Sequence, residues 1–313
     1  MVKYRKLKER KGVFMLEWSV PKLSDAAWVK KTVEMSGSIG SDVSFANIYL
    51  LRGKYNTEVS RYRDFLIRRY YGDGARLGYT FPVGRGDYAK ALKEIELDAK
   101  SRNERLRFAF VTENQKKMLE EFMPGRFEFT SDAGDSDYIY YCRELAQLSG
   151  KAFHKKKNHV SKFIRTYPEY RYAELGECNW EDASVVADAW YYEHLQQEDE
   201  SQAAEYRAIR EAFENFRELE LMGGIIYVND SPCAMTLASY INQNTVDVHF
   251  EKAVGECALN GGYAAINNFF AAGLNGAAWL NREEDIGIEG LRKAKMSYHP
   301  KIILKKYSAV EKQ

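Results

Sequence analysis

Cysteine, proline and long apolar runs are scarce in this sequence of 313 residues. Its four cysteines lie far apart and form no Cys-x-x-Cys pair, which disfavours a disulfide framework or a zinc knuckle and fits a reducing cytoplasm. No stretch approaches the roughly 18 consecutive apolar residues of a membrane-spanning helix, so we expect no transmembrane segment. The sequence also has no excess of either charge, because 46 lysines and arginines are balanced by 45 aspartates and glutamates. This balance disfavours a globally basic nucleic-acid binder and an acidic solvating tail, and we expect a cytoplasmic globular protein.

Hydrophobic and aromatic residues are plentiful, at 45% and 14% of the chain. They are sufficient for the cores of two domains, which the length also favours. Tyrosine is unusually frequent, with 22 copies. Because a buried tyrosine needs a hydrogen-bond partner for its hydroxyl group, this number suggests a polar cleft as well as a plain core.

The second half of the chain predicts the element order β-α-α-β-β-β-α-β-α-β. Period-two patterns and short apolar runs predict strands at 170–175, 222–230, 233–241, 244–253, 277–283 and 301–310. Apolar residues at helical spacing predict helices at 179–196, 202–219, 261–274 and 288–296. Three adjacent strands exclude a plain doubly wound sheet, and the later helix-strand units predict a mixed sheet with helices on both faces.

The first half ends in a similar order, β-α-β-α-β. Its clearest elements are a helix at 87–101, a strand at 107–113 and a final strand over the string DYIYY. We therefore predict an α/β (α+β) protein of two similar domains, 1–148 and 149–313. Each domain is expected to hold a mixed sheet flanked by helices, with the active site in the second domain.

The order of elements resembles the GNAT acyltransferase fold, and two copies in tandem resemble the peptidyltransferases that use aminoacyl-tRNA. Nearly the whole chain is similar to the bacterial family grouped with the C-terminal domain of phosphatidylglycerol lysyltransferase. The strings that carry this resemblance are SDVSFANIYLLR, FPVGRGD, DYIYYCRELAQLSGKAFHKKKNHVSKF, VHFEKA and NREEDIGIEGLRKAKMSYHP. The resemblance implies an acyltransferase. The full lipid-modifying enzymes of this kind also carry a multi-helix membrane domain, which we expect this chain to lack.

In the GNAT fold, acyl donors lie where the fourth and fifth strands splay apart, and backbone N–H groups of the next helix hold the donor's phosphates. The corresponding helix entry here contains Gly261 and Gly262. Glycine lets the backbone approach an anion closely, so we predict phosphate contact at these two residues. The Gln/Arg-x-x-Gly-x-Gly/Ala string of coenzyme A users is not present in clean form. A plain turn is the alternative.

Asp247, His249 and Glu251 alternate along the strand predicted at 244–253, so we expect them to share one face and a polar cleft. His249 or Glu251 would accept a proton from an attacking amine, as acyl transfer requires. A structural polar network is the first alternative. Zinc is a second, but no other His or Cys has supporting spacing, and we expect no metal site.

Charged residues follow the strand predicted at 277–283, at the edge where open α/β sheets bind ligands. We predict a catalytic role for Asp285 and substrate or phosphate binding by Arg282, Arg292 and Lys295. Arg292 and Lys295 are one helical turn apart and share a face. The alternative is an ion-pair network of Arg282, Glu284 and Asp285 that only fixes the strand end.

A basic stretch from Lys151 to Arg165 has six lysines and arginines, two histidines and no acid, whereas residues 174–220 contain 14 acidic residues. The stretch predicts contact with an RNA phosphate backbone. The expected contact residues are Lys155, Lys156, Lys157 and Lys162. The alternative is a solvated basic helix that pairs with the acidic helices.

Three functions follow from these patterns. The first is transfer of an aminoacyl group from aminoacyl-tRNA to an amine or hydroxyl acceptor, with tRNA as partner. A lipid headgroup, a peptide and a small amine are the candidate acceptors. The second is an N-acyltransferase for small molecules that uses an acyl-CoA, and the third is a binding protein without catalysis. No tightly bound cofactor is expected in any of them.

Overall fold

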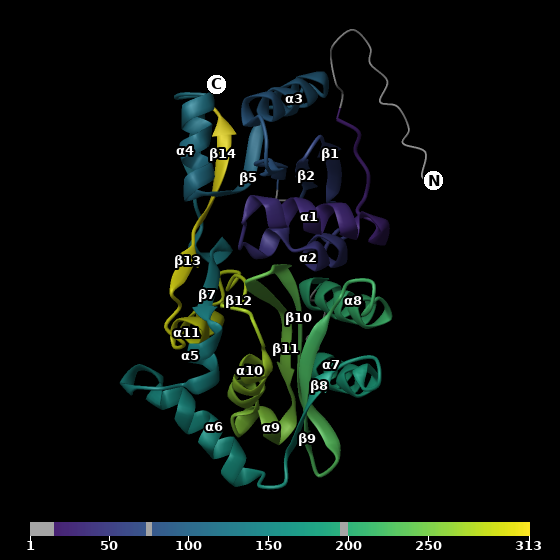
Figure 1. Cartoon of the computed structure of the whole chain (residues 1–313), viewed down its shortest axis with the longest axis vertical. Coiled ribbons are helices and arrows are strands. Elements are labelled where there is room, and N and C mark those ends of the chain that lie inside the picture. Colours follow the sequence, from purple (N-terminus) through teal and green to yellow (C-terminus); the bar gives the residue numbers. More distant parts are fainter. Residues whose placement is uncertain (1–15, 73–76, 195–199) are drawn as a thin grey trace.

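The structure is a computed structural model, and it describes residues 16–72, 77–194 and 200–313. Two mixed sheets lie end to end along the molecule, with α1 and α2 between them (Figure 1). The first sheet has the strand order β1-β2-β3-β5-β14-β6, with β4 on β2. Its strands are β1 (Glu58–Tyr62), β2 (Phe65–Tyr71), β3 (Leu77–Thr80), β4 (Val83–Gly84), β5 (Arg107–Thr112), β6 (Phe127–Thr130) and β14 (Lys306–Glu311). The helices of this part are α1 (Ala26–Ser36), α2 (Phe45–Leu50), α3 (Tyr88–Ser101) and α4 (Glu113–Phe122).

The second sheet has the order β13-β7-β12-β11-β10-β9-β8. Its strands are β7 (Asp137–Tyr141), β8 (Arg171–Leu175), β9 (Met222–Val228), β10 (Ser231–Asn242), β11 (Thr245–Ala253), β12 (Trp279–Asn281) and β13 (Ile302–Leu304). Its helices are α5 (Cys142–Gln147), α6 (His154–Thr166), α7 (Trp180–His194), α8 (Glu200–Glu214), α9 (Gly255–Leu259), α10 (Gly262–Gly273) and α11 (Glu289–Met296). Helices α7 and α8 cover one face and α10 covers the other (Figure 1). The predicted fold class is confirmed. The predicted elements of this half occur in the predicted order, with α9 as an additional helix and the last predicted strand divided in two.

The two sheets exchange strands. β7 comes from the first half of the chain but pairs with β12 and β13 of the second sheet, whereas the last strand, β14, pairs with β5 and β6 of the first sheet. The single strand predicted at 301–310 is therefore two strands in different sheets. The boundary at residue 148 stays a prediction, and a cut there would remove one strand from each sheet.

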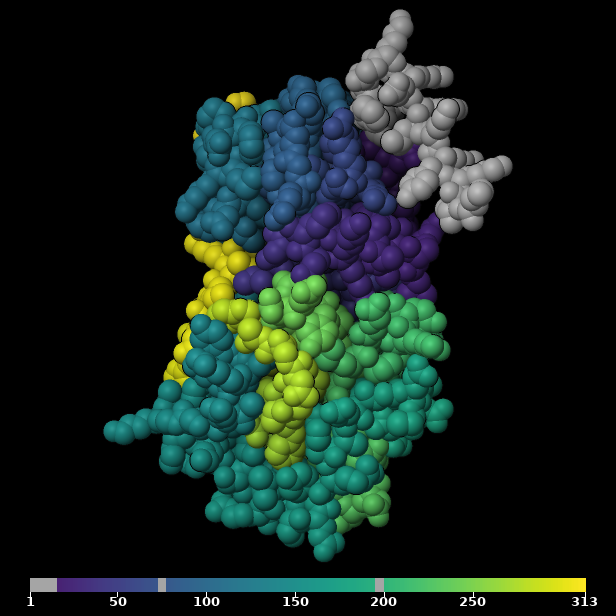
Figure 2. All heavy atoms as spheres, in the orientation of Figure 1, coloured from purple at the N-terminus to yellow at the C-terminus, as the bar shows by residue number. Residues whose placement is uncertain are grey.

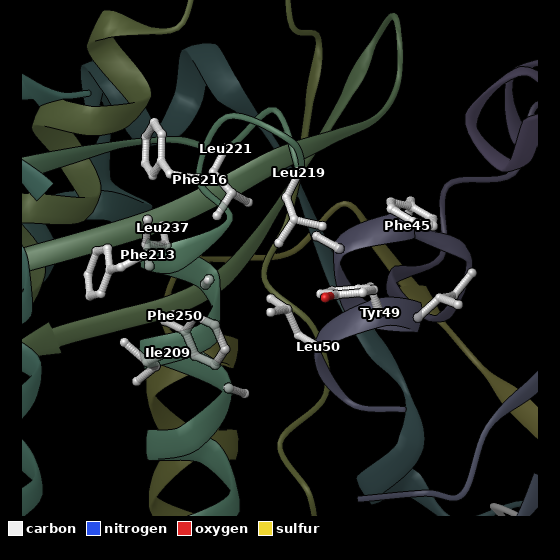
Figure 3. Close-up of a cluster of buried hydrophobic side chains, with 14 of the residues drawn as sticks. Phe45, Tyr49, Leu50, Ile209, Phe213, Phe216, Leu219, Leu221, Leu237 and Phe250 are labelled. Atoms are coloured by element: carbon white, nitrogen blue, oxygen red, sulfur yellow. The ribbon is translucent and has the colours of Figure 1, made fainter. Parts of the chain in front are cut away.

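The largest hydrophobic cluster crosses from one sheet region to the other. Phe45, Tyr49 and Leu50 of α2 pack toward Phe213 of α8 and the adjoining Leu219 (Figure 3). The space-filling view shows the same continuity, with α1 and α2 seated on the second half of the chain (Figure 2). A shared apolar core of this kind stabilises the relative position of the two sheets, because separating them would expose it to water.

Among the described residues, no helix is both long enough and apolar enough to cross a membrane. This agrees with the absence of a long apolar run in the sequence.

Candidate functional site

The polar strand β11 contains a β-bulge that divides its polar residues between two faces. Strands β10 and β11 shift register here, and His249 is the extra residue between Val248 and Phe250. Beyond a bulge the alternation of side chains is reversed. Asp247 and His249 therefore lie on the face toward α2, whereas Glu251 lies on the opposite face, toward α10. The prediction that all three share one face is wrong for Glu251.

A first polar cluster, which we call the junction cluster, lies where α2 meets the second sheet. It consists of Asn47, Ser239, Asp247, His249 and Glu283. His249 has its Nδ1 atom 3.2 Å from Glu283 Oε1 and 3.5 Å from Asp247 Oδ2, and its Nε2 atom 2.8 Å from Ser239 Oγ. Asn47 Nδ2 donates to Glu283 Oε1 at 2.8 Å and to Asp247 Oδ2 at 3.2 Å.

Asp247 is the more deeply buried of the two carboxylates of the junction cluster. It is completely buried, and its Oδ1 atom has no hydrogen-bond partner among the described residues. Burial and the neighbouring carboxylates of Glu283 and Asp137 raise the pKa of Asp247 well above its usual range. The nearby ammonium of Lys306 forms its shorter ion pair with Asp137, at 2.5 Å. The negative charge of the junction cluster is therefore only partly compensated.

A second cluster, which we call the arginine cluster, lies on the α10 face of the sheet. It consists of Glu251, Asn267, Arg282, Tyr298 and Lys156. Arg282 Nη2 donates to Glu251 Oε1 at 2.7 Å, and Asn267 Nδ2 donates to Glu251 Oε2 at 3.2 Å. The guanidinium of Arg282 lies 4.8 Å from the centre of the Tyr298 ring. Arg282 Nη1 and Asn267 Oδ1 are buried and have no partner among the described residues.

Lys156 joins the arginine cluster from α6. Its side chain is half-buried, and its Nζ atom lies 4.1 Å from the centre of the Tyr298 ring. Burial lowers the pKa of Lys156 to about 8, and the charge of Arg282 adds to this effect, whereas Glu251 opposes it. A lysine with this pKa exchanges its proton near neutral pH, which an ordinary surface lysine does not.

The other predicted RNA contacts on α6 are solvent-facing. Lys155 and Lys157 are exposed, and Lys162 is exposed but donates to the carbonyl of Leu259 at 3.1 Å. A hollow of about 490 Å³, whose lining includes Lys151 and Lys157, lies beside the first turn of α6. Among the described residues no ion pair joins α6 to α7 or α8, so the alternative of a basic helix neutralised by the acidic helices finds no support.

Asp285, Arg292 and Lys295 hold the turn that follows β12. Asp285 is buried and accepts hydrogen bonds from Tyr138 at 2.5 Å and from Arg292 at 2.7 and 2.9 Å. Burial alone would raise the pKa of Asp285, but the bonds from Arg292 and Tyr138 lower it. Lys295 Nζ donates to the carbonyls of Arg282 and Glu284 at 2.6 and 2.5 Å. These contacts fix the backbone from which Arg282 and Glu283 project to opposite faces.

Gly261 and Gly262 are in close contact with neighbouring elements. Gly261 has φ +99°, and a Cβ atom there would lie 2.4 Å from the carbonyl oxygen of His159 on α6. A Cβ atom on Gly262 would lie 2.5 Å from the sulfur of Cys257 on α9. Close helix packing therefore explains both glycines, and phosphate contact at this position stays a prediction.

Several members of the two clusters were not found from the sequence. Asn47 and Asn267 each interrupt an apolar helix, FANIYL and GYAAINNFFAAG, and this interruption was the available signal. Glu283 and Tyr298 lie within the string NREEDIGIEGLRKAKMSYHP but have no motif spacing of their own. Ser239 lies within an ordinary strand and gave no signal.

Comparison with known proteins identifies the family of the chain. The family model described as the C-terminal part of phosphatidylglycerol lysyltransferase matches residues 34–310. No curated protein matches the sequence. A conserved protein of unknown function from Bacteroides thetaiotaomicron has a solved structure that is 36% identical, with a TM-score of 0.89 over 95% of this chain and 100% of that chain.

Two more distant structures show the fold. The structure of L-PGS from Bacillus licheniformis is 14% identical, with a TM-score of 0.63 over 92% of each chain. An acetyltransferase of the GNAT family from Colwellia psychrerythraea is 10% identical, with a TM-score of 0.51 over 95% of this chain and 100% of that chain. The predicted GNAT-like architecture is confirmed. The chain belongs to the family of the C-terminal domain of phosphatidylglycerol lysyltransferase.

Proposed function

We propose that this protein is an acyltransferase that moves an aminoacyl group from aminoacyl-tRNA to an amine or hydroxyl acceptor, with the arginine cluster as its reaction centre. The family supports the reaction class. One observation carries the choice of donor: α6 turns Lys156 into the arginine cluster and leaves Lys155 and Lys157 exposed beside it. A surface that binds RNA phosphates would thus adjoin the reacting groups.

The first turn of α6 supports anion binding. It carries four basic or histidine side chains, from His154 to Lys157, and no acid. Positive side chains at the positive end of a helix dipole are unfavourable, and a bound phosphate relieves this repulsion. The hollow beside Lys151 and Lys157 leaves room for such a phosphate.

The arginine cluster has the groups that the reaction requires. The acceptor attacks the ester carbonyl carbon, the bond from this carbon to the ribose oxygen of the tRNA breaks, and the proton lost by the acceptor ends on that oxygen. Neutral Lys156 accepts this proton and returns it to the leaving oxygen. The unpartnered Nη1 of Arg282 stabilises the negative charge that develops on the carbonyl oxygen, and Glu251 holds the guanidinium in place.

Acyl-CoA is the alternative donor, because the fold is shared with an acetyltransferase of the GNAT family. Two contacts disfavour it. The N–H group of Gly255, at the start of α9, donates to the carboxylate of Glu193 at 3.0 Å, where a phosphate would meet a negative charge. The backbone at Gly261 lies against α6. Stabilisation of the protein against heat by coenzyme A esters, but not by charged tRNA, would favour this alternative.

A single-turnover assay tests the proposal. Charged tRNA with labelled amino acids is mixed with excess protein and with small amines or phospholipid headgroups as acceptors. Lys156→Met should lower the rate of transfer about 100-fold or more, and Glu251→Gln should also lower it, because the proton carrier or the position of Arg282 is lost. Lys155→Met is the control for loss of a tRNA-binding charge, since it removes an exposed charge one residue away, and the protein is kept at concentrations that saturate the tRNA for both variants. Equal rates for Lys156→Met and Lys155→Met would remove Lys156 from the reaction.

A further inference from the structure

The junction cluster combines three metal-ligating groups from β11 and from the end of β12. Asp247 and His249 lie on β11, and Glu283 follows β12. One atom of each, Asp247 Oδ2, His249 Nδ1 and Glu283 Oε1, lies within 4.8 Å of the other two. The cluster is separate from the arginine cluster, because it lies on the opposite face of the sheet.

Two of the three separations between these atoms fit a small divalent cation, and the third lies within 4.8 Å. Zinc bonds to His nitrogen and carboxylate oxygen at about 2.0 to 2.2 Å, which places tetrahedral ligands about 3.3 to 3.5 Å apart. His249 Nδ1 lies 3.2 Å from Glu283 Oε1 and 3.5 Å from Asp247 Oδ2. The second ring nitrogen, Nε2, lies 2.8 Å from Ser239 Oγ, and such a second contact orients a ligating histidine.

The negative charge of the junction cluster also favours a bound cation. Two carboxylates lie beside one imidazole, and the side chains of Asp247 and His249 are 0% and 1% exposed. The Oδ1 atom of Asp247 has no hydrogen-bond partner among the described residues, although a buried carboxylate oxygen needs one. A carboxylate that is buried in this way is tolerated when the carboxylate coordinates a metal ion.

Access and a fourth ligand come from the side of Glu283. Its side chain is 20% exposed and lines a cavity of about 30 Å³ together with Asn47 and Glu284. This volume holds a water molecule, which would complete a tetrahedral site with three protein ligands. We infer that Asp247, His249 and Glu283 together bind one divalent transition-metal ion of the zinc class, which ties β11 and the end of β12 to Asn47 of α2.

Metal binding to the tag-free full-length protein tests this inference. After chelator treatment and dialysis, zinc is added and both bound metal and thermal unfolding are measured. We expect about one zinc per chain and a rise in the melting temperature, with no comparable response to magnesium, which avoids nitrogen ligands. Asp247→Asn should abolish the zinc response while its metal-free melting temperature stays at or above that of the wild-type protein, because a buried charge is removed.

Glu284→Gln is the matched control, since Glu284 lines the same cavity but is not one of the three ligands. It should keep the full zinc response. Less than a tenth of an equivalent of bound zinc in the wild-type protein, with an unchanged melting temperature, would overturn the inference and leave a hydrogen-bonded network of His249 with Asp247 and Glu283. An equal loss of response in both variants would overturn it as well.

Discussion

Lys156 differs from Lys155 and Lys157 in the burial of its side chain. Lys155 and Lys157 belong to the same basic string, but their side chains face solvent, whereas Lys156 packs on the ring of Tyr298. The helical period explains this, because residues adjacent in sequence point about 100° apart around a helix axis. One basic string therefore presents two exposed lysines, which we propose bind phosphates, and one half-buried lysine, which we propose carries the proton.

The pKa of Lys156 predicts the pH dependence of transfer. Burial and Arg282 lower this pKa to about 8, so about a tenth of the protein holds neutral Lys156 at pH 7 and about nine tenths at pH 9. If neutral Lys156 is the active form, the single-turnover rate should rise about tenfold over this range and level off above it. Glu251→Gln should shift the midpoint to lower pH, because Glu251 stabilises the charged form. A flat profile after correction for uncatalysed ester hydrolysis would contradict the role of Lys156.

At the scale of elements, α6 is held against the sheet by its contact with the start of α10. Gly261 forms this contact, with its Cα facing the backbone of His159. In the proposed mechanism this contact is important, because α6 is the element that places Lys156 beside Arg282.

Gly261→Ala should therefore destabilise the protein by roughly 1–3 kcal/mol, since the new Cβ atom meets backbone at 2.4 Å and φ is positive. Gly290→Ala on α11 is the control, because a Cβ atom there meets nothing within 4 Å, and it should be neutral or slightly stabilising. Urea denaturation measures both changes. Similar free energies of unfolding for the two variants would show that α6 does not depend on this contact.

Local sequence patterns were sufficient to predict most helices and strands of the second half of the chain. The strand predicted at 244–253 is β11 at Thr245–Ala253, and the helix predicted at 261–274 is α10 at Gly262–Gly273. Apolar periodicity is local, and it identifies such elements well. The bulge at His249 was not predictable, because it depends on the pairing with β10 and has no residue signature in β11. This one residue moved Glu251 to the other face of the sheet.

Contacts between residues far apart in the sequence could not be predicted from local patterns either. Asn47 lies about 200 residues from Asp247 in the chain, and only the fold brings its amide to the junction cluster. The strand predicted at 301–310 has a continuous β pattern, but the chain passes from one sheet to the other at Lys305. Nothing in the alternation of its residues distinguishes one sheet from two.

At the scale of the whole molecule, strand exchange and a shared core join the two halves. Lys306, at the start of β14, forms a buried ion pair with Asp137, at the start of β7, so the two exchanged strands meet at the junction. Charge is distributed unevenly over this single body. The basic helix α6 lies on one side of the second sheet, whereas the acidic helices α7 and α8 lie on the other (Figure 1).

This uneven charge makes tRNA binding the central test. Wild-type affinity for tRNA should be measurable at low salt and should fall steeply as salt is raised, because each neutralised phosphate releases counterions. Replacing Lys155 and Lys157 together by Ala should weaken binding and reduce the slope of log affinity against log salt by up to about two, with an unchanged melting temperature. No detectable affinity of the wild-type protein for charged tRNA at low salt would contradict the proposed donor and leave acyl-CoA as the donor to test.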